Sequence, residues 1–161
     1  MGAKFDRFLE YTLATLMALM LLSVVWQVVT RYFLGDPSSF TDELARYLLI
    51  WIGMLGGAYA SGKNMHLAID LLPAKLTGKN KYRLMLFIYI LIILFVAATF
   101  VIGGIRLVYI TYTLGQTSAA MQIPLAYVYS ILPIAGLLMI VYKIRDIIRL
   151  NPEDSTSISN S

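Results

Sequence analysis

Four long apolar stretches constrain this chain more than any other feature of its sequence. A soluble helix rarely runs for twenty residues without a charged side chain, yet this happens repeatedly within only 161 residues. Twenty helical residues rise about 30 Å, which matches the hydrocarbon core of a bilayer. We therefore predict an all-α integral membrane protein with four transmembrane helices. Their spans are about residues 11–32, 44–62, 84–106 and 123–143.

The second span is the shortest of the four. Its uncharged part covers only residues 47–62, so it reaches both membrane surfaces only if Arg46 or Lys63 extends its side chain to the headgroups. Within it, Gly53, Gly57 and Ser61 recur every four residues and form one smooth helical face. This pattern favours close packing against another helix, while a groove for a substrate is the alternative.

The basic residues predict the orientation. Ten of the thirteen Lys and Arg residues lie at the N-terminus, in the loop between spans two and three, or at the C-terminus. The other three are Arg31, Arg46 and Arg106. This bias places both termini and the middle loop in the cytoplasm. Trp26 and Trp51 then lie near the outer ends of spans one and two, where interfacial aromatic anchors are expected.

Outside the four spans, the sequence predicts little regular structure. Residues 1–150 are predicted to form one transmembrane domain, and the polar residues 151–161 a disordered tail. Residues 66–76 of the middle loop (HLAIDLLPAKL) could lie on the membrane surface as a short interfacial helix, although an ordinary solvated loop fits equally well. The chain has no cysteine and one histidine, so neither a cofactor nor a metal site is predicted.

Acidic residues are informative through their absence. Residues 71–145 contain no Asp or Glu, and Glu10 lies at the cytoplasmic edge of span one. A proton-driven transporter needs a titratable group within the membrane, so this chain alone is poorly suited to ion-coupled transport. It also lacks the GxSxG, HExxH and P-loop motifs. We therefore predict that it is not an enzyme.

Charged residues gather instead in the first outer connection, within residues 31–51 (RYFLGDPSSFTDELARYLLIW). Ser39 or Thr41 can cap the following helix, which would place Asp42 and Glu43 in its first turn. Arg46 follows Asp42 by four residues and Glu43 by three, so the three side chains share one face. With Arg31 they form a predicted docking cluster; a capped helix start with two extended arginines is the plainer interpretation.

The second outer connection carries another marked stretch, residues 114–124 (LGQTSAAMQIP). Pro124 stands where a helix tolerates it, at the start of span four. The candidate site residues in this outer loop motif are Gly115, Gln116, Thr117, Ser118 and Pro124.

Three motifs in order, RYFLG-x-P-x-x-F-T-D-E-L-A-R-Y-L-L-I-W, HLAIDLLP and LGQTS-x-x-x-x-IP, resemble those of one family over nearly the whole chain up to about Arg149. The chain resembles the small membrane subunit (DctQ-like, small permease) of tripartite ATP-independent periplasmic (TRAP) transporters. The resemblance implies a multi-pass scaffold subunit in the bacterial inner membrane. Its partners would be a large multi-span membrane subunit and a periplasmic substrate-binding protein, which together import an organic acid with sodium.

The resemblance leaves the substrate open among dicarboxylates, keto acids and sugar acids such as sialic acid. A self-sufficient transporter working as a homodimer is the main alternative, and a membrane enzyme or electron carrier is a remote one. Under the preferred hypothesis, Arg31, Asp42, Glu43 and Arg46 help to dock the large subunit or the periplasmic protein.

Overall fold

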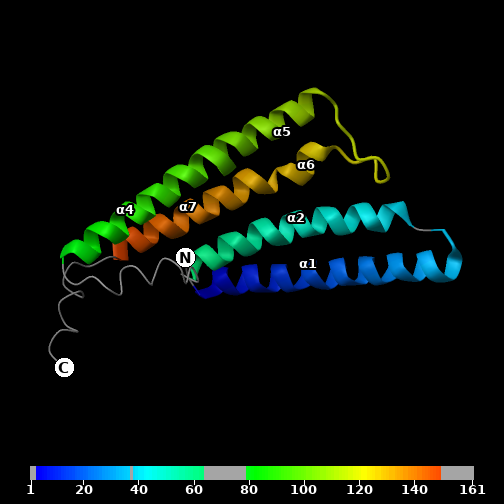
Figure 1. The fold of residues 1–161 in the computed structure, drawn as a ribbon, viewed down its shortest axis with the longest axis horizontal. Coiled ribbons are helices and arrows are strands. Elements are labelled where there is room, and N and C mark those ends of the chain that lie inside the picture. Colours follow the sequence, from blue (N-terminus) through cyan, green and yellow to red (C-terminus); the bar gives the residue numbers. More distant parts are fainter. Residues whose placement is uncertain (1–2, 37, 64–78, 150–161) are drawn as a thin grey trace.

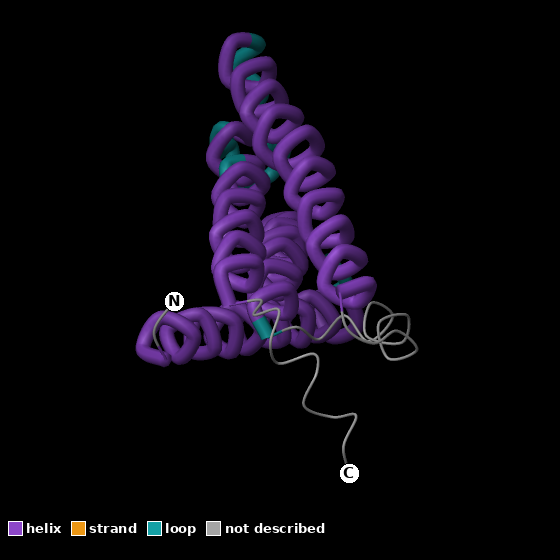
Figure 2. The backbone as a smooth tube through the Cα atoms, turned by 90° about the vertical axis from the view of Figure 1, so that its left-hand side faces the viewer, coloured by secondary structure: helices purple, strands orange, loops and turns teal. Residues whose placement is uncertain are grey.

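The computed structural model describes residues 3–36, 38–63 and 79–149, and all regular structure in these ranges is helical (Figures 1 and 2). The elements are α1 (Ala3–Val29), η1 (Thr30–Leu34), α2 (Ser39–Gly62), α4 (Lys79–Val96), η3 (Ala97–Ile102), α5 (Gly103–Thr113), α6 (Leu125–Tyr129) and α7 (Ile131–Arg149). The π-helical segments η1 and η3 continue their neighbours, so four long helical stretches result. The all-α prediction is confirmed.

Three stretches are long and apolar enough to cross a membrane: Lys4–Leu34, Tyr82–Thr113 and Leu125–Ile148. The helix α2 is not among them; Asp42, Glu43 and Arg46 precede its uncharged part, residues 47–62, which is about 24 Å long and contains four glycines. The fourth span and the orientation therefore stay predictions. The suggested interfacial helix and the C-terminal tail lie outside the described residues.

The helices lie side by side rather than around a closed central core (Figure 1). An antiparallel hairpin is formed by α1 and α2; α7 packs on α2, and α4, η3 and α5 form one long helix against α6 and α7. The end of η1, the start of α2 and the 114–124 connection lie at one end, which we call the loop end. The start of α1, the end of α2, the start of α4 and the end of α7 lie at the opposite end, which we call the terminal end.

Side-chain contacts join three helices at the terminal end. The Tyr142 hydroxyl donates to Asp6 Oδ1 at 2.7 Å, which links α7 to α1. Tyr59 donates to Glu10, and Lys63 approaches the same carboxylate at 3.7 Å, so α2 is also held to α1. Sequence reasoning did not anticipate these links, because they depend on the register of helices far apart in the chain.

Glycines allow the closest approaches between helices. A Cβ on Gly57 would lie 3.1 Å from Met139 Cε, and one on Gly62 only 2.7 Å from the Tyr142 ring. Ser61 is buried, whereas a Cβ on Gly53 would have no neighbour within 4 Å. The predicted small-residue face therefore meets α7 at Gly57, and Gly53 is open.

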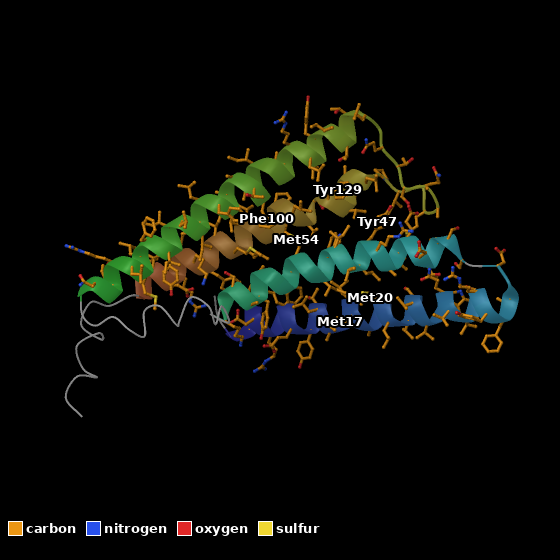
Figure 3. The ribbon with its side chains drawn as sticks, viewed as in Figure 1. Met17, Met20, Tyr47, Met54, Phe100 and Tyr129 are labelled. Carbon is orange, nitrogen blue, oxygen red and sulfur yellow. The ribbon has the colours of Figure 1, made fainter. Side chains whose placement is uncertain are left out.

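The long helix meets α7 through two further glycines that the repeat pattern did not single out. A Cβ on Gly104 would lie 2.9 Å from Pro133 Cδ, and one on Gly136 would lie 2.8 Å from Cβ of Phe100, which is labelled in Figure 3. Both distances are shorter than carbon atoms tolerate. These two positions therefore set how closely the long helix packs on α7.

Replacing Gly136 by alanine should destabilise the protein by about 1–3 kcal/mol, because the new methyl group must displace Phe100 or the helix backbone. The measurement is thermal unfolding of the purified chain in detergent, followed by circular dichroism. The matched control is Gly53→Ala, whose methyl group meets nothing and improves helix propensity. Equal midpoints for the two variants would contradict this packing.

Candidate functional site

The first turn of α2 positions two neighbouring carboxylates at the loop end. Gly35 turns the chain with φ of 68°, and Ser38 caps α2 by accepting the Thr41 N–H on its hydroxyl at 3.4 Å. Asp42 lies in this first turn, where the unpaired N–H groups of the helix favour negative charge, and Glu43 follows it directly. The cap fixes the start of α2 and thereby the positions of Asp42 and Glu43.

Glu43 reaches across to the 114–124 turn, far away in the sequence. Its carboxylate accepts five hydrogen bonds: at Oε2 from Ser118 Oγ (2.6 Å), Ala120 N (2.8 Å) and Met121 N (2.9 Å), and at Oε1 from Ala119 N (3.0 Å) and the Tyr47 hydroxyl (2.9 Å). Tyr47 lies on the side of α2 that faces the turn (Figure 3). We call this arrangement of Glu43, Tyr47 and residues 118–121 the Glu43 latch.

The turn also carries its own backbone hydrogen bonds. Ser118 N donates to Ile123 O at 2.9 Å, Leu125 N donates to Gln116 O at 3.0 Å, and Thr117 pairs with Pro124 in an isolated antiparallel bridge. Three successive N–H groups, of residues 119–121, are left to point at Glu43. Met121 N also donates to Ser118 Oγ at 3.2 Å, so without this carboxylate the N–H groups of Ala119 and Ala120 are the two that would need water or another acceptor.

The candidate residues of the 114–124 turn differ in how much of their surface is exposed. Ser118 is 2% exposed and is committed to Glu43. Gly115 has φ of 59°, a conformation that glycine adopts without strain and that lets the chain leave α5. Gln116, Thr117 and Pro124 are exposed on the surface.

Asp42 makes a separate set of contacts. Its Oδ1 accepts from Gln27 Nε2 at 2.8 Å, and its Oδ2 pairs with Arg46 one turn further along α2. The Gln27 contact ties α1 to α2, and the Arg46 side chain remains 71% exposed. Arg31 is also exposed and makes no ion pair or hydrogen bond with the described residues. Of the four predicted cluster residues, the structure thus pairs only Asp42 with Arg46.

Sequence reasoning did not assign Gln27 or Tyr47 to the site, although Gln27 is a polar residue in an uncharged stretch of α1 and Tyr47 directly follows Arg46 on α2. It treated Trp51 as a membrane-surface anchor, whereas the structure has its indole N–H donating to Val128 O at 3.2 Å, between α2 and α6. Trp26 is 55% exposed on α1. Whether either side chain anchors the protein at a membrane surface stays a prediction.

The contacts lower the pKa of both acids. The pKa of Glu43 falls to about 2, chiefly because Ser118 donates to the carboxylate; burial opposes this effect, and the Met121 and Ala120 N–H groups add to it. The pKa of Asp42 is lowered mainly by its hydrogen bond from Arg46 and next by that from Gln27. Both groups are therefore carboxylates at neutral pH.

The geometry is that of a fixed surface rather than a reaction centre. The Glu43 oxygens are occupied by internal donors, and among the described residues no three His, Cys, Asp or Glu side chains come together to hold a metal ion. The fold and this site thus describe a multi-pass helical membrane protein whose polar groups support the connections at its loop end.

Comparison with known proteins identifies which membrane protein class this is. Residues 20–152 match the family described as tripartite ATP-independent periplasmic transporters, DctQ component. The chain belongs to this family, and is a small permease subunit of a bacterial TRAP transporter rather than an enzyme.

Three relatives illustrate the similarity. The chain is 31% identical to the sialic acid TRAP transporter small permease protein SiaQ of Vibrio cholerae, over 88% of this chain and 80% of that protein. A putative TRAP transporter small permease protein of Haemophilus influenzae is 23% identical, over 84% and 82% of the two chains. The isethionate TRAP transporter permease protein DctMQ of Oleidesulfovibrio alaskensis is 26% identical, over 91% of this chain but 24% of that longer protein.

Replacing Glu43 by glutamine should loosen the turn, because an amide presents one acceptor oxygen and an NH₂ group to donors that now meet a carboxylate. We expect the N–H groups of residues 119–121 to exchange with deuterium at least about tenfold faster, as lost hydrogen bonds of ordinary strength imply. The control is Asp42→Asn, which alters a neighbouring acid that does not touch the turn. Equal exchange in both variants would argue against the latch.

The latch should also persist in acid. Because the folded-state pKa of Glu43 lies below the ordinary value of 4.5, its stabilising effect is complete above that pH and is lost as the pH falls through about 2. A ¹³C NMR titration of the Glu43 carboxylate in detergent should show it still ionised at pH 4. Ser118→Ala should raise the midpoint, since Ser118 makes the largest contribution. A wild-type midpoint near 4.5 would refute this assignment.

Proposed function

We propose that this chain is the static scaffold subunit of a sodium-driven TRAP transporter that imports an organic acid across the bacterial inner membrane. It would cross the membrane four times with both termini in the cytoplasm. A large membrane subunit would carry the substrate and sodium, and a periplasmic substrate-binding protein would deliver the substrate to the loop end.

The observation that carries this proposal is the position of the charged residues. Along α1 and η1 none lies between Glu10 and Arg31, and in the long helix none lies between Arg83 and Arg106. Every Asp, Glu, Lys and Arg of the described helices is thus close to one of their two ends. Coupled transport needs an ion-binding or titratable group within the membrane, so another subunit must supply it.

The names of the relatives support an organic acid as the substrate. One is named for sialic acid, a sugar acid, and another for isethionate, a sulfonic acid. This chain corresponds to about a quarter of the DctMQ protein, which favours a large permease part working beside a segment of this kind. Since the named substrates differ among similar chains, we assign substrate choice to the other components.

The loop end is the proposed docking surface for these partners. Glu43 serves it indirectly by holding the 114–124 turn against α2, whereas Arg46 and Arg31 present exposed positive charges. The exposed Gln116 and Thr117 add amide and hydroxyl groups beside them. A charged pair at the rim of an interface chiefly affects recognition and the rate of association.

Replacing Arg46 by alanine should lower uptake by roughly fivefold or more, because Asp42 loses its paired charge and the partner loses a contact. Uptake of labelled substrate would be measured in cells producing all three components, together with co-purification of the large subunit. Arg46→Lys is the matched control, since it retains the charge and should preserve most of both signals.

Two outcomes would overturn the proposal. The docking role fails if uptake is lost while the complex and its affinity for the periplasmic protein stay unchanged. The scaffold role fails if this chain alone, reconstituted in liposomes, accumulates substrate against a gradient, since it would then be the homodimeric transporter.

A further inference from the structure

A groove opens between the long helix and the last helices near the loop end. The contact of Gly104 with Pro133 brings α5 and α7 together, and beyond it α5 and α6 diverge towards the 114–124 turn (Figure 1). The groove has a volume of about 300 Å³. Its lining residues are Ile105, Val108, Tyr109, Tyr112, Ser130 and Pro133.

The lining offers little to a polar ligand. The Ser130 hydroxyl, its only aliphatic hydroxyl, donates to Tyr127 O at 2.6 Å within the chain. Tyr109 and Tyr112 are 67% and 70% exposed, so their rings border the groove while much of their surface remains accessible. Such rings are typical of the level where hydrocarbon meets headgroups.

A positive charge lies beside the groove. Arg106 follows Ile105 directly and precedes Tyr109 by three residues, so it shares the edge of this helix face. It is exposed, and no ion pair or hydrogen bond joins it to another described residue. The lining is thus apolar, and Arg106, although not itself a lining residue, is next to Ile105 on α5.

The position of Arg106 along the helix indicates its depth in the membrane. It follows Arg83 by 23 residues on one continuous helical stretch, which corresponds to about 35 Å. The hydrocarbon core is about 30 Å thick, so with Arg83 at one headgroup layer, Arg106 reaches the other. Phosphate groups occur at that depth on every side of the protein.

We propose that this groove binds a phospholipid of the outer leaflet, with its phosphate on Arg106 and an acyl chain along the groove. Guanidinium groups pair well with phosphate oxygens, often through two parallel hydrogen bonds. The other occupant to consider is a helix of a partner protein. To pair with Arg106, such a helix would need a carboxylate at the edge of the membrane, and placing a charge there is costly. The phosphate of a phospholipid is already present at this depth. The assignment to the outer leaflet rests on the proposed orientation, but the inference does not rest on the proposed transport role.

The test is native mass spectrometry of the full chain, delipidated in mild detergent and titrated with defined lipids. Phosphatidylglycerol and phosphatidylethanolamine should each form a one-to-one adduct, and diacylglycerol, which lacks the phosphate, should not. Arg106→Leu should weaken the adduct about tenfold, the effect of losing one charge-assisted interaction. Arg31→Leu, an exposed loop-end arginine that does not line the groove, is the matched control and should bind as wild type.

A second variant tests the groove itself. Val108→Trp fills it but keeps Arg106, and it should also lose the adduct while circular dichroism shows unchanged helix content. The proposal is overturned if Arg106→Leu or Val108→Trp binds lipid as wild type does, if Arg31→Leu is equally impaired, or if wild type forms no adduct.

A protein occupant would be revealed by cross-linking. The chain has no cysteine, so Tyr109→Cys introduces a unique thiol at the groove. In intact membranes we expect this thiol to react with a lipid-soluble maleimide and to form no cross-link to another polypeptide. Efficient cross-linking to a protein would assign the groove to that partner instead.

Discussion

The loop end of this protein depends on one carboxylate. Glu43 lies on α2 and satisfies three backbone N–H groups, one hydroxyl of the 114–124 turn and the Tyr47 hydroxyl. N–H groups that meet no other acceptor in the turn require one, and a charged acceptor binds them more strongly than a neutral one. Trp51 adds a second link from α2 to α6 through Val128. The 114–124 turn and α6 are thereby held to α2 by specific contacts.

The local features of the fold were predictable from the sequence. Apolar stretches indicated the helices, and the spacing of Asp42 and Arg46 predicted their pairing, because residues four apart share a helix face. The cap was expected at Ser39 or Thr41, and the structure assigns it to Ser38, one residue earlier. These features depend only on neighbouring residues.

The long-range contacts were not predictable in the same way. Glu43 and Ser118 both lie in stretches that the sequence analysis selected as candidate sites. The spacing of residues along the chain does not indicate, however, that two residues 75 positions apart will be in contact. The packing glycines show the same limit: Gly53 belongs to the regular repeat and is open, whereas Gly104 and Gly136, outside it, make the tight contacts. The register between two helices is set by their packing in three dimensions, so a repeat pattern along one helix does not predict it.

The latch has a consequence for biosynthesis. Its two parts are separated by most of the chain, including all of α4 and α5, so a ribosome must synthesise more than two thirds of the protein before Glu43 can meet its donors. Until then Glu43, in the hairpin of α1 and α2, lacks its donors in residues 118–121. A nascent chain that stalls or is truncated before residue 118 is thus chemically distinct from a completed one, and proteases or chaperones that survey newly inserted proteins could discriminate between them.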